Sequence, residues 1–124
     1  MATPVSLRTL SSEQQYQADK AAGNTVPLDQ EPHIIDFKHW YVIKNRYPYN
    51  TAFCEHDMIL PRRVFATRGE ISIAEAIELD TILDDLKHQY DVVFENLPHR
   101  RSVLTHYHLH LGRYHKNYDK AFHL

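Results

Sequence analysis

The chain has 124 residues, the size of one compact domain, and its hydrophobic and charged contents are those of a folded protein. No stretch approaches the roughly 20 apolar residues of a membrane span, and the N-terminal stretch lacks the apolar core of a secretory signal. The net charge of −2 and the single cysteine, Cys54, exclude a general nucleic-acid binder and an internal disulfide. We therefore expect a cytoplasmic protein that binds neither membranes nor nucleic-acid polymers.

Residues 1–30 are polar and predict an N-terminal arm that is partly helical or disordered. Ser12 and Gln15 have the spacing of a capping box, and Gly23 could end a helix of about ten residues. Because such a helix has few apolar side chains to bury, we expect it to be peripheral. Residues 31–124 are expected to form the main domain.

Two strands are predicted in the next part of the chain. Residues 34–43 are rich in β-branched and aromatic side chains and predict one strand. Pro48, between Asn45 and Asn50, indicates a loop. The second strand is predicted at residues 56–60, where Pro61 ends it.

The clearest predicted helix begins at Ser72 and runs to about His88. Ser72 and Glu75 have capping-box spacing. The apolar spacing predicts that the side with Ile73 and Ile77 packs on a sheet. The acidic residues are expected to face solvent: Glu75, Glu78 and Asp85.

Two further strands are predicted at residues 91–95 and 102–111, joined by a loop at 96–101. Strands predominate, with one long helix between them and no regular strand–helix alternation. This order predicts an α+β fold with an antiparallel sheet.

The last predicted strand carries three histidines, His106, His108 and His110. Side chains of a strand alternate between its two faces, so the three rings would share one face and Tyr107 and Leu109 the other. A lone histidine on a strand is usually structural, but three in strict alternation indicate function. We predict that the three rings line one pocket and form the active centre.

Two chemistries use such a row. Neutral imidazole is the commonest metal ligand, and alternating histidines on a strand present ligands together. Alternatively, one imidazole attacks phosphorus while its neighbours hold the phosphate oxygens. Periodicity does not distinguish these possibilities.

The segment HYHLHL at 106–111 resembles the signature of the histidine triad (HIT) family, His-x-His-x-His followed by apolar residues. NRYP at 45–48 resembles the family's Asn-x-x-Pro turn, and HDMILPRR at 56–63 resembles its segment of histidine, apolar strand, proline and basic residues. The resemblance extends over residues 34–115. It implies a HIT-like antiparallel sheet of about five strands with one long helix and a peripheral N-terminal helix.

The resemblance also implies a homodimeric nucleotide hydrolase or nucleotidyl transferase that acts on the α-phosphate of a nucleotide conjugate without a cofactor. His108 would be the nucleophile that forms a covalent nucleotidyl-histidine. His106 would orient it through its backbone carbonyl, and His110 would contact phosphate oxygens and assist the leaving group. His56 would lie near the phosphate and Asn45 near the ribose. Without the resemblance, His56 would be a structural histidine and Asn45 a turn residue.

The loop before the triad departs from the family pattern. Ser102 lies one residue further from His106 than the family's phosphate-binding hydroxyl, so either Ser102 or Thr105 takes that role. Arg100 and Arg101 could supply further phosphate donors, because arginine forks match phosphate geometry.

Two other functions stay open. One is a nucleotide-binding module without catalysis, which the altered loop at 98–101 would explain. The other is a zinc or iron enzyme, although no carboxylate lies in the triad strand to complete a common facial ligand set. Its ligands would be His106, His108 and one of His56, His110 or His115.

Overall fold

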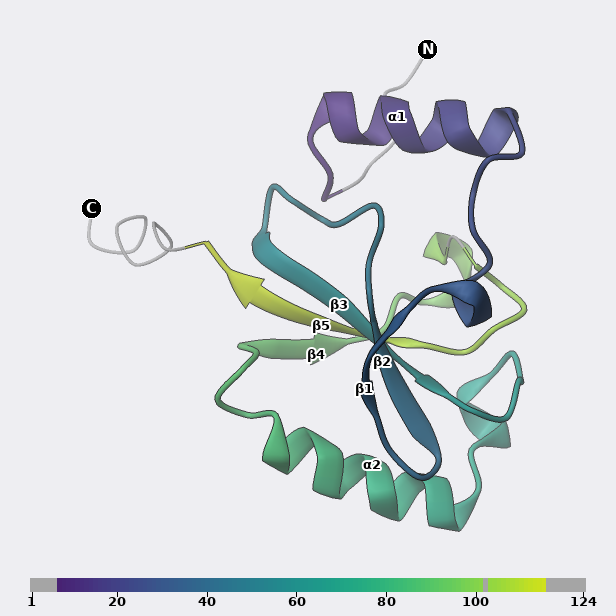
Figure 1. Cartoon of the computed structure of the whole chain (residues 1–124), viewed down its shortest axis with the longest axis vertical. Coiled ribbons are helices and arrows are strands. Elements are labelled where there is room, and N and C mark those ends of the chain that lie inside the picture. The colour runs from purple at the N-terminus through teal and green to yellow at the C-terminus, as the bar shows by residue number, and fades with distance from the viewer. Residues whose placement is uncertain (1–6, 102, 116–124) are drawn as a thin grey trace.

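One antiparallel sheet of five strands forms the centre of the described chain, in the order β1-β2-β3-β5-β4 (Figure 1). The structure is a computed structural model, and it describes residues 7–101 and 103–115. This sheet, with two α-helices in the described residues, confirms the predicted α+β class. The elements are α1 (Leu10–Ala21), η1 (Leu28–Gln30), β1 (His33–Asp36), β2 (Trp40–Lys44), β3 (Phe53–Pro61), η2 (Arg68–Glu70), α2 (Ile73–Asp85), β4 (Val92–Phe94), η3 (Pro98–Arg100) and β5 (Leu109–Tyr114).

The single strand predicted at residues 34–43 is in fact a hairpin of β1 and β2. The chain turns between them, where the Phe37 N–H donates to the Trp40 carbonyl at 2.8 Å. The turn contains neither glycine nor proline, so the usual sequence signals of a turn are missing. The prediction of extended structure was right, and the prediction of one strand was wrong.

The strand predicted at 102–111 is also displaced, because β5 begins only at Leu109. The β3–β5 ladder extends no further than the Ile59–Leu109 pair. Two residues earlier, the Tyr107 N–H donates to the Phe65 carbonyl at 2.6 Å instead of to a strand. His106 and His108 therefore precede the strand, and the prediction that all three histidines lie on one strand is wrong.

The long helix begins where predicted but buries a different face. Ser72 caps α2, and Glu75 completes the capping box. Ile73 and Ile77 are 82% and 64% exposed, whereas Glu75 is 4% exposed, so the predicted packing face is wrong. The Glu75 carboxylate accepts from Arg63 at 2.8 Å, and this hydrogen bond lowers its pKa to about 2. The helix instead packs through residues further along: Leu79, Ile82, Leu83 and Leu86.

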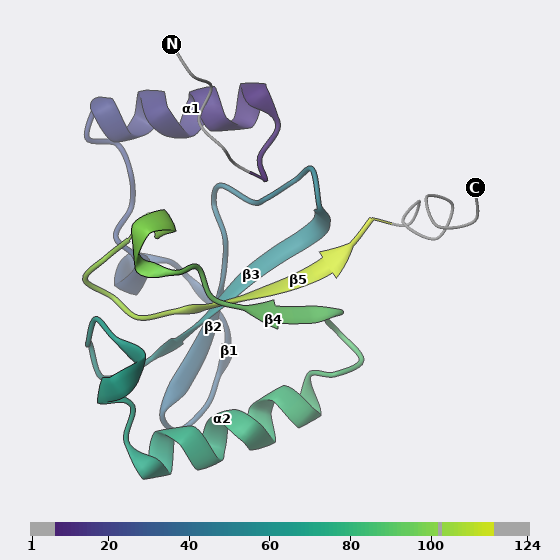
Figure 2. The ribbon, with the colours of Figure 1, turned by 180° about the vertical axis from the view of Figure 1, so that it is seen from behind.

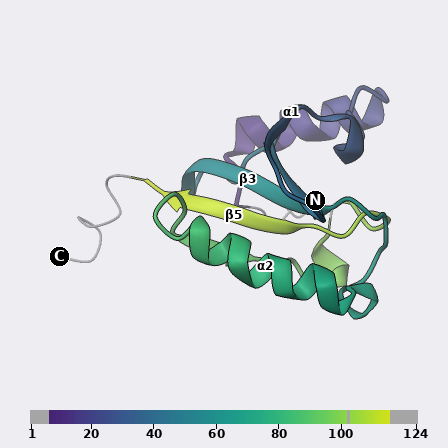
Figure 3. The same ribbon diagram turned by 60° about the horizontal axis from the view of Figure 1, so that its bottom comes forward.

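The sheet is covered on both faces, with α2 on one side and α1 with η1 on the other (Figures 2 and 3). Alternation along β2 and β3 divides the apolar side chains between the two faces. The cluster facing α2 contains Trp40, Val42, Ile59, Phe65, Ile82, Leu86, Tyr107, Leu109 and Leu111. The cluster on the opposite face contains Tyr41, Ile43, Met58 and Leu60, with Leu28 of η1 packed against it.

The N-terminal helix is capped three residues before the predicted position. The Thr9 side chain, not that of Ser12, is the N-cap and accepts from the Ser12 N–H. Gly23 has a φ of 72° just after the helix, as expected of a glycine that ends a helix. No helix of the described residues is long and apolar enough to cross a membrane.

Gly112 in β5 lies against the ring of Phe53. A Cβ at residue 112 would come within 2.7 Å of ring carbons of Phe53. We expect Gly112→Ala to lower the free energy of unfolding by about 1–3 kcal/mol, because the ring or the strand has to move. Gly69→Ala is the control, since a Cβ there meets no atom within 4 Å. Urea unfolding measures both variants, and equal stabilities would contradict this packing.

Candidate active site

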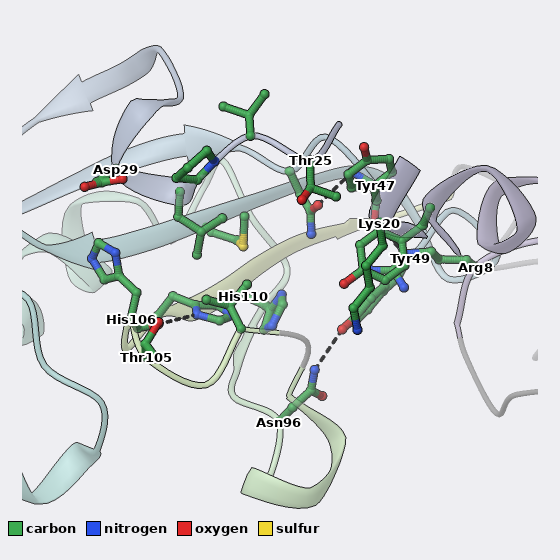
Figure 4. Close-up of a pocket in the computed structure, with 18 of the residues that line it drawn as sticks. Arg8, Lys20, Thr25, Asp29, Tyr47, Tyr49, Asn96, Thr105, His106 and His110 are labelled. Carbon is green, nitrogen blue, oxygen red and sulfur yellow. Dashed lines mark hydrogen bonds between the residues drawn. The ribbon is translucent and has the colours of Figure 1, made fainter. Parts of the chain in front are cut away.

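A cavity of about 450 Å³ lies on the face of the sheet opposite α2 (Figure 4). Its volume is within the range of small-molecule sites. His106, His108 and His110 all line it, while Tyr107 and Leu109 belong to the cluster under α2. The predicted alternation is therefore confirmed, although only His110 lies in a regular strand. The chain just before β5 is extended, so its side chains still alternate between the two faces although it is not paired with β3.

The ring of His108 is oriented by the backbone of His106. His108 Nδ1 lies 2.9 Å from the His106 carbonyl oxygen. A carbonyl can only accept, so Nδ1 carries the proton and a neutral His108 has its lone pair on Nε2. Burial lowers the pKa of His108, which favours this neutral form. The ring nitrogen with the lone pair is thus part of a side chain that lines the cavity.

A second pair of histidines has its tautomers fixed by a chain of hydrogen bonds. The Tyr49 N–H donates to His56 Nδ1 at 2.9 Å, so neutral His56 carries its proton on Nε2. His56 Nε2 lies 2.7 Å from His110 Nδ1 and donates to it. His110 therefore carries its own proton on Nε2, which is buried and has no hydrogen-bond partner among the described residues.

Burial keeps both members of this pair neutral. It lowers the pKa of His56 to about 4, with smaller contributions from the charges of Arg8 and His108. It lowers the pKa of His110 to about 2, and His108, His56 and Arg8 act in the same direction. His110 Nε2 is consequently a neutral N–H donor. A buried unpaired donor that lines a cavity is suited to an anionic ligand oxygen.

His106 differs from its two neighbours in the row. It is also buried, and burial lowers its pKa, while hydrogen bonding to the backbone of Pro61 opposes that shift. Its Nε2 has no hydrogen-bond partner among the described residues. Its carbonyl contacts His108, and its Nε2 is available to a ligand.

The structure brings some of the predicted phosphate-binding residues to the cavity and not others. Asn45 and Thr105 line it. His56 does not line it; its Nε2 contacts His110 instead. Arg100 and Arg101 do not line it either. Arg101 donates to the Ala66 carbonyl at 2.8 Å, which directs its guanidinium elsewhere. Ser102 lies outside the described residues.

The N-terminal arm forms a wall of the cavity that the sequence did not predict. Arg8 and two residues of α1, Tyr16 and Lys20, line the cavity together with residues 25–29. Figure 4 shows Arg8 and Lys20 near Tyr47 and Tyr49, on the side away from His106. Within α1, the side chains that line the cavity are aromatic and charged, so apolar periodicity does not reveal this contact.

The described residues contain no group of three histidine, cysteine or acidic side chains placed to hold a metal ion. The facing nitrogens of His56 and His110 bind each other. His115 is exposed, and its Nε2 lies 2.8 Å from the Asn50 carbonyl, so it is not brought to the histidine row. The ligand sets considered for zinc or iron are therefore not assembled in this arrangement.

Comparison with known proteins supports the fold. No protein-family model matches the sequence, and no curated protein matches it significantly. The structure is similar to a histidine triad protein from Clostridium difficile, with a TM-score of 0.50 and 16% identity over 83% of this chain and 94% of that chain. A HIT family hydrolase from Legionella pneumophila Philadelphia 1 has a TM-score of 0.46 and 20% identity over 77% of this chain and 88% of that chain. The chain thus has the fold of a histidine triad protein.

Proposed function

We propose that this protein is an enzyme that hydrolyses a nucleotide conjugate, or transfers its nucleotidyl group, through a covalent intermediate on His108. One observation carries the proposal: the His106 carbonyl holds the proton of His108 on Nδ1, which leaves Nε2 as a nucleophile in a ring that lines the cavity. An imidazole fixed in this tautomer and kept neutral by burial is ready to attack an electrophilic phosphorus.

The reaction we propose has two steps. His108 Nε2 attacks the α-phosphorus, and the bond to the leaving group breaks as that group takes the electron pair and a proton from solvent. Water, or an acceptor in a transferase, then attacks the same phosphorus, and the N–P electron pair returns to Nε2. The attacking molecule releases its proton to solvent.

His110 would stabilise the charge that develops on a phosphoryl oxygen. Its Nε2–H is an unpaired donor, and donors that are already oriented are effective in such sites. Because burial lowers its pKa to about 2, we assign it hydrogen-bond donation to a phosphoryl oxygen and not the assistance to the leaving group that the family resemblance implied. Asn45 and Thr105 would contact the ribose and a phosphate oxygen.

The proposal is tested with untagged protein and a panel of nucleoside 5′-phosphoramidates of the four common bases, with and without chelator. We expect turnover of at least one substrate at a rate that the chelator does not change. Chelator-sensitive turnover would indicate a metal enzyme instead. Binding without turnover of any conjugate would indicate a nucleotide-binding module.

We also propose a homodimer, by resemblance to the family. Multi-angle light scattering at micromolar concentration should give twice the monomer mass of 14.6 kDa. The monomer mass at that concentration would contradict the proposal.

A further inference from the structure

Arg8 connects the N-terminal arm to the histidine pair through Tyr49. The guanidinium carbon of Arg8 lies 5.1 Å from the centroid of the Tyr49 ring. That ring stacks on His110, with 5.3 Å between centroids and 25° between planes. Figure 4 shows Tyr49 between Arg8 and His110. The backbone of Tyr49 also donates to His56, so any displacement of Tyr49 would disturb both histidines.

Arg8 is itself held firmly. Its Nε donates to the Tyr47 carbonyl at 2.8 Å, and its guanidinium pairs with Glu13 at 3.0 Å. It also lies over the Tyr16 ring, 4.6 Å from the centroid. The side chains of Arg8 and Glu13 are only 8% and 10% exposed, so solvent screens this pair much less than a surface ion pair.

We infer that Arg8 is a positioning residue for the histidine row: it holds Tyr49 against His110 and adds to the effect of burial in disfavouring protonation of the hydrogen-bonded His56–His110 pair. The inference rests on the proposed function for the reaction that the row performs. The contacts that carry it do not depend on any substrate.

The effect of Arg8 on protonation of the His56–His110 pair follows from the charges around these two rings. The 2.7 Å bond between His56 and His110 needs one N–H and one lone pair. A second proton would place two N–H groups face to face. The Arg8 charge lowers the pKa of both rings, as does His108 when it is protonated. The other described neighbours of the pair, Asn45, Phe53 and Phe94, are uncharged. Glu13 pairs with Arg8.

The inference is tested by NMR titration of the histidine rings in the full chain. Arg8→Gln alone would leave Glu13 buried without its cation, so the principal variant is Arg8→Gln with Glu13→Gln. We expect protonation of the His56–His110 pair to move to higher pH by roughly half a unit or more, since a nearby cation disfavours imidazolium. Arg8→Lys keeps the charge and should titrate close to the native protein. Arg62→Gln removes an arginine outside the cavity, one that pairs with Asp36, and should leave the titration unchanged.

Kinetics provide the second readout. The acid limb of the pH profile should shift in the same direction. The kcat should fall about tenfold, less than the roughly 10²–10⁴-fold that a catalytic acid or base contributes, because Arg8 acts through Tyr49. Arg8→Lys should restore it. An unchanged titration in the double variant, or an Arg8→Lys protein that titrates like the double variant, would overturn the inference. The NMR titration needs no turnover, so a protein without nucleotide activity would refute the proposed function while leaving the role of Arg8 in the pair testable by itself.

Discussion

Replacing His108 with alanine should reduce turnover by about a thousandfold or more, because the replacement removes the proposed nucleophile. Nucleotide binding should persist, since the cavity keeps the His110 donor, Asn45 and the N-terminal wall. The measurements are single-turnover kinetics with a phosphoramidate substrate and a Kd for the product nucleotide. The two together separate loss of chemistry from loss of binding.

His88→Ala provides a matched control for that variant. His88 is exposed just after α2 and does not line the cavity, so its removal should change neither rate nor affinity. If His108→Ala turned over at a rate close to the native one, the covalent mechanism would be wrong. If it lost binding and turnover together, His108 would be a ligand-binding or structural residue.

Acid should destabilise the fold through His56. In the unfolded chain this ring titrates near 6.5, whereas burial lowers its folded pKa to about 4. Between these values the unfolded state binds more protons, so stability falls as the pH falls from 6.5 to 4. A shift of this size corresponds to a loss on the order of 3 kcal/mol. The lowered pKa of His110 acts in the same direction.

His56→Gln tests this prediction because its amide can still accept from Tyr49 and donate to His110 without titrating. Urea unfolding at pH 7, 5 and 4 should show a weaker dependence on pH in the variant than in the native protein. Equal pH dependence in the two proteins would place the acid-sensitive group elsewhere. A substitution of the exposed His88 again supplies a control.

Local sequence signals predicted the features of this fold that depend only on residues close together in the sequence. The capping box of Ser72 and Glu75 placed the start of α2. The alternation of His106, His108 and His110 placed three rings on one cavity. Both patterns are set within a few residues, by capping geometry and by the extended backbone.

Features that depend on distant partners were not predictable in the same way. Glu75 is buried because Arg63, twelve residues earlier, satisfies its carboxylate, and the exposure of Ile73 and Ile77 follows from that orientation of the helix. The start of β5 depends on where its pairing with β3 stops, at Ile59 and Leu109. Hydrophobic periodicity carries no information about either partner.

The N-terminal wall of the site is the clearest case of this kind. Its link to the histidine row passes from Arg8 through Tyr49 to His110, three residues from separate segments of the chain. No spacing motif joins them, and a polar arm with little to bury was reasonably predicted to be peripheral. The site therefore includes a segment whose sequence resembles a solvated tail.

The central claim is the covalent intermediate, and it is tested most directly by trapping. The native protein is mixed with a conjugate labelled at the α-phosphate, quenched in alkali, in which a phosphorus–histidine bond survives, and examined by peptide mass spectrometry. The account predicts a nucleotidyl group on His108 that is lost in acid and is absent from His108→Ala. Turnover in the native protein with no adduct at any quench time, or an adduct on another residue that persists in His108→Ala, would contradict it.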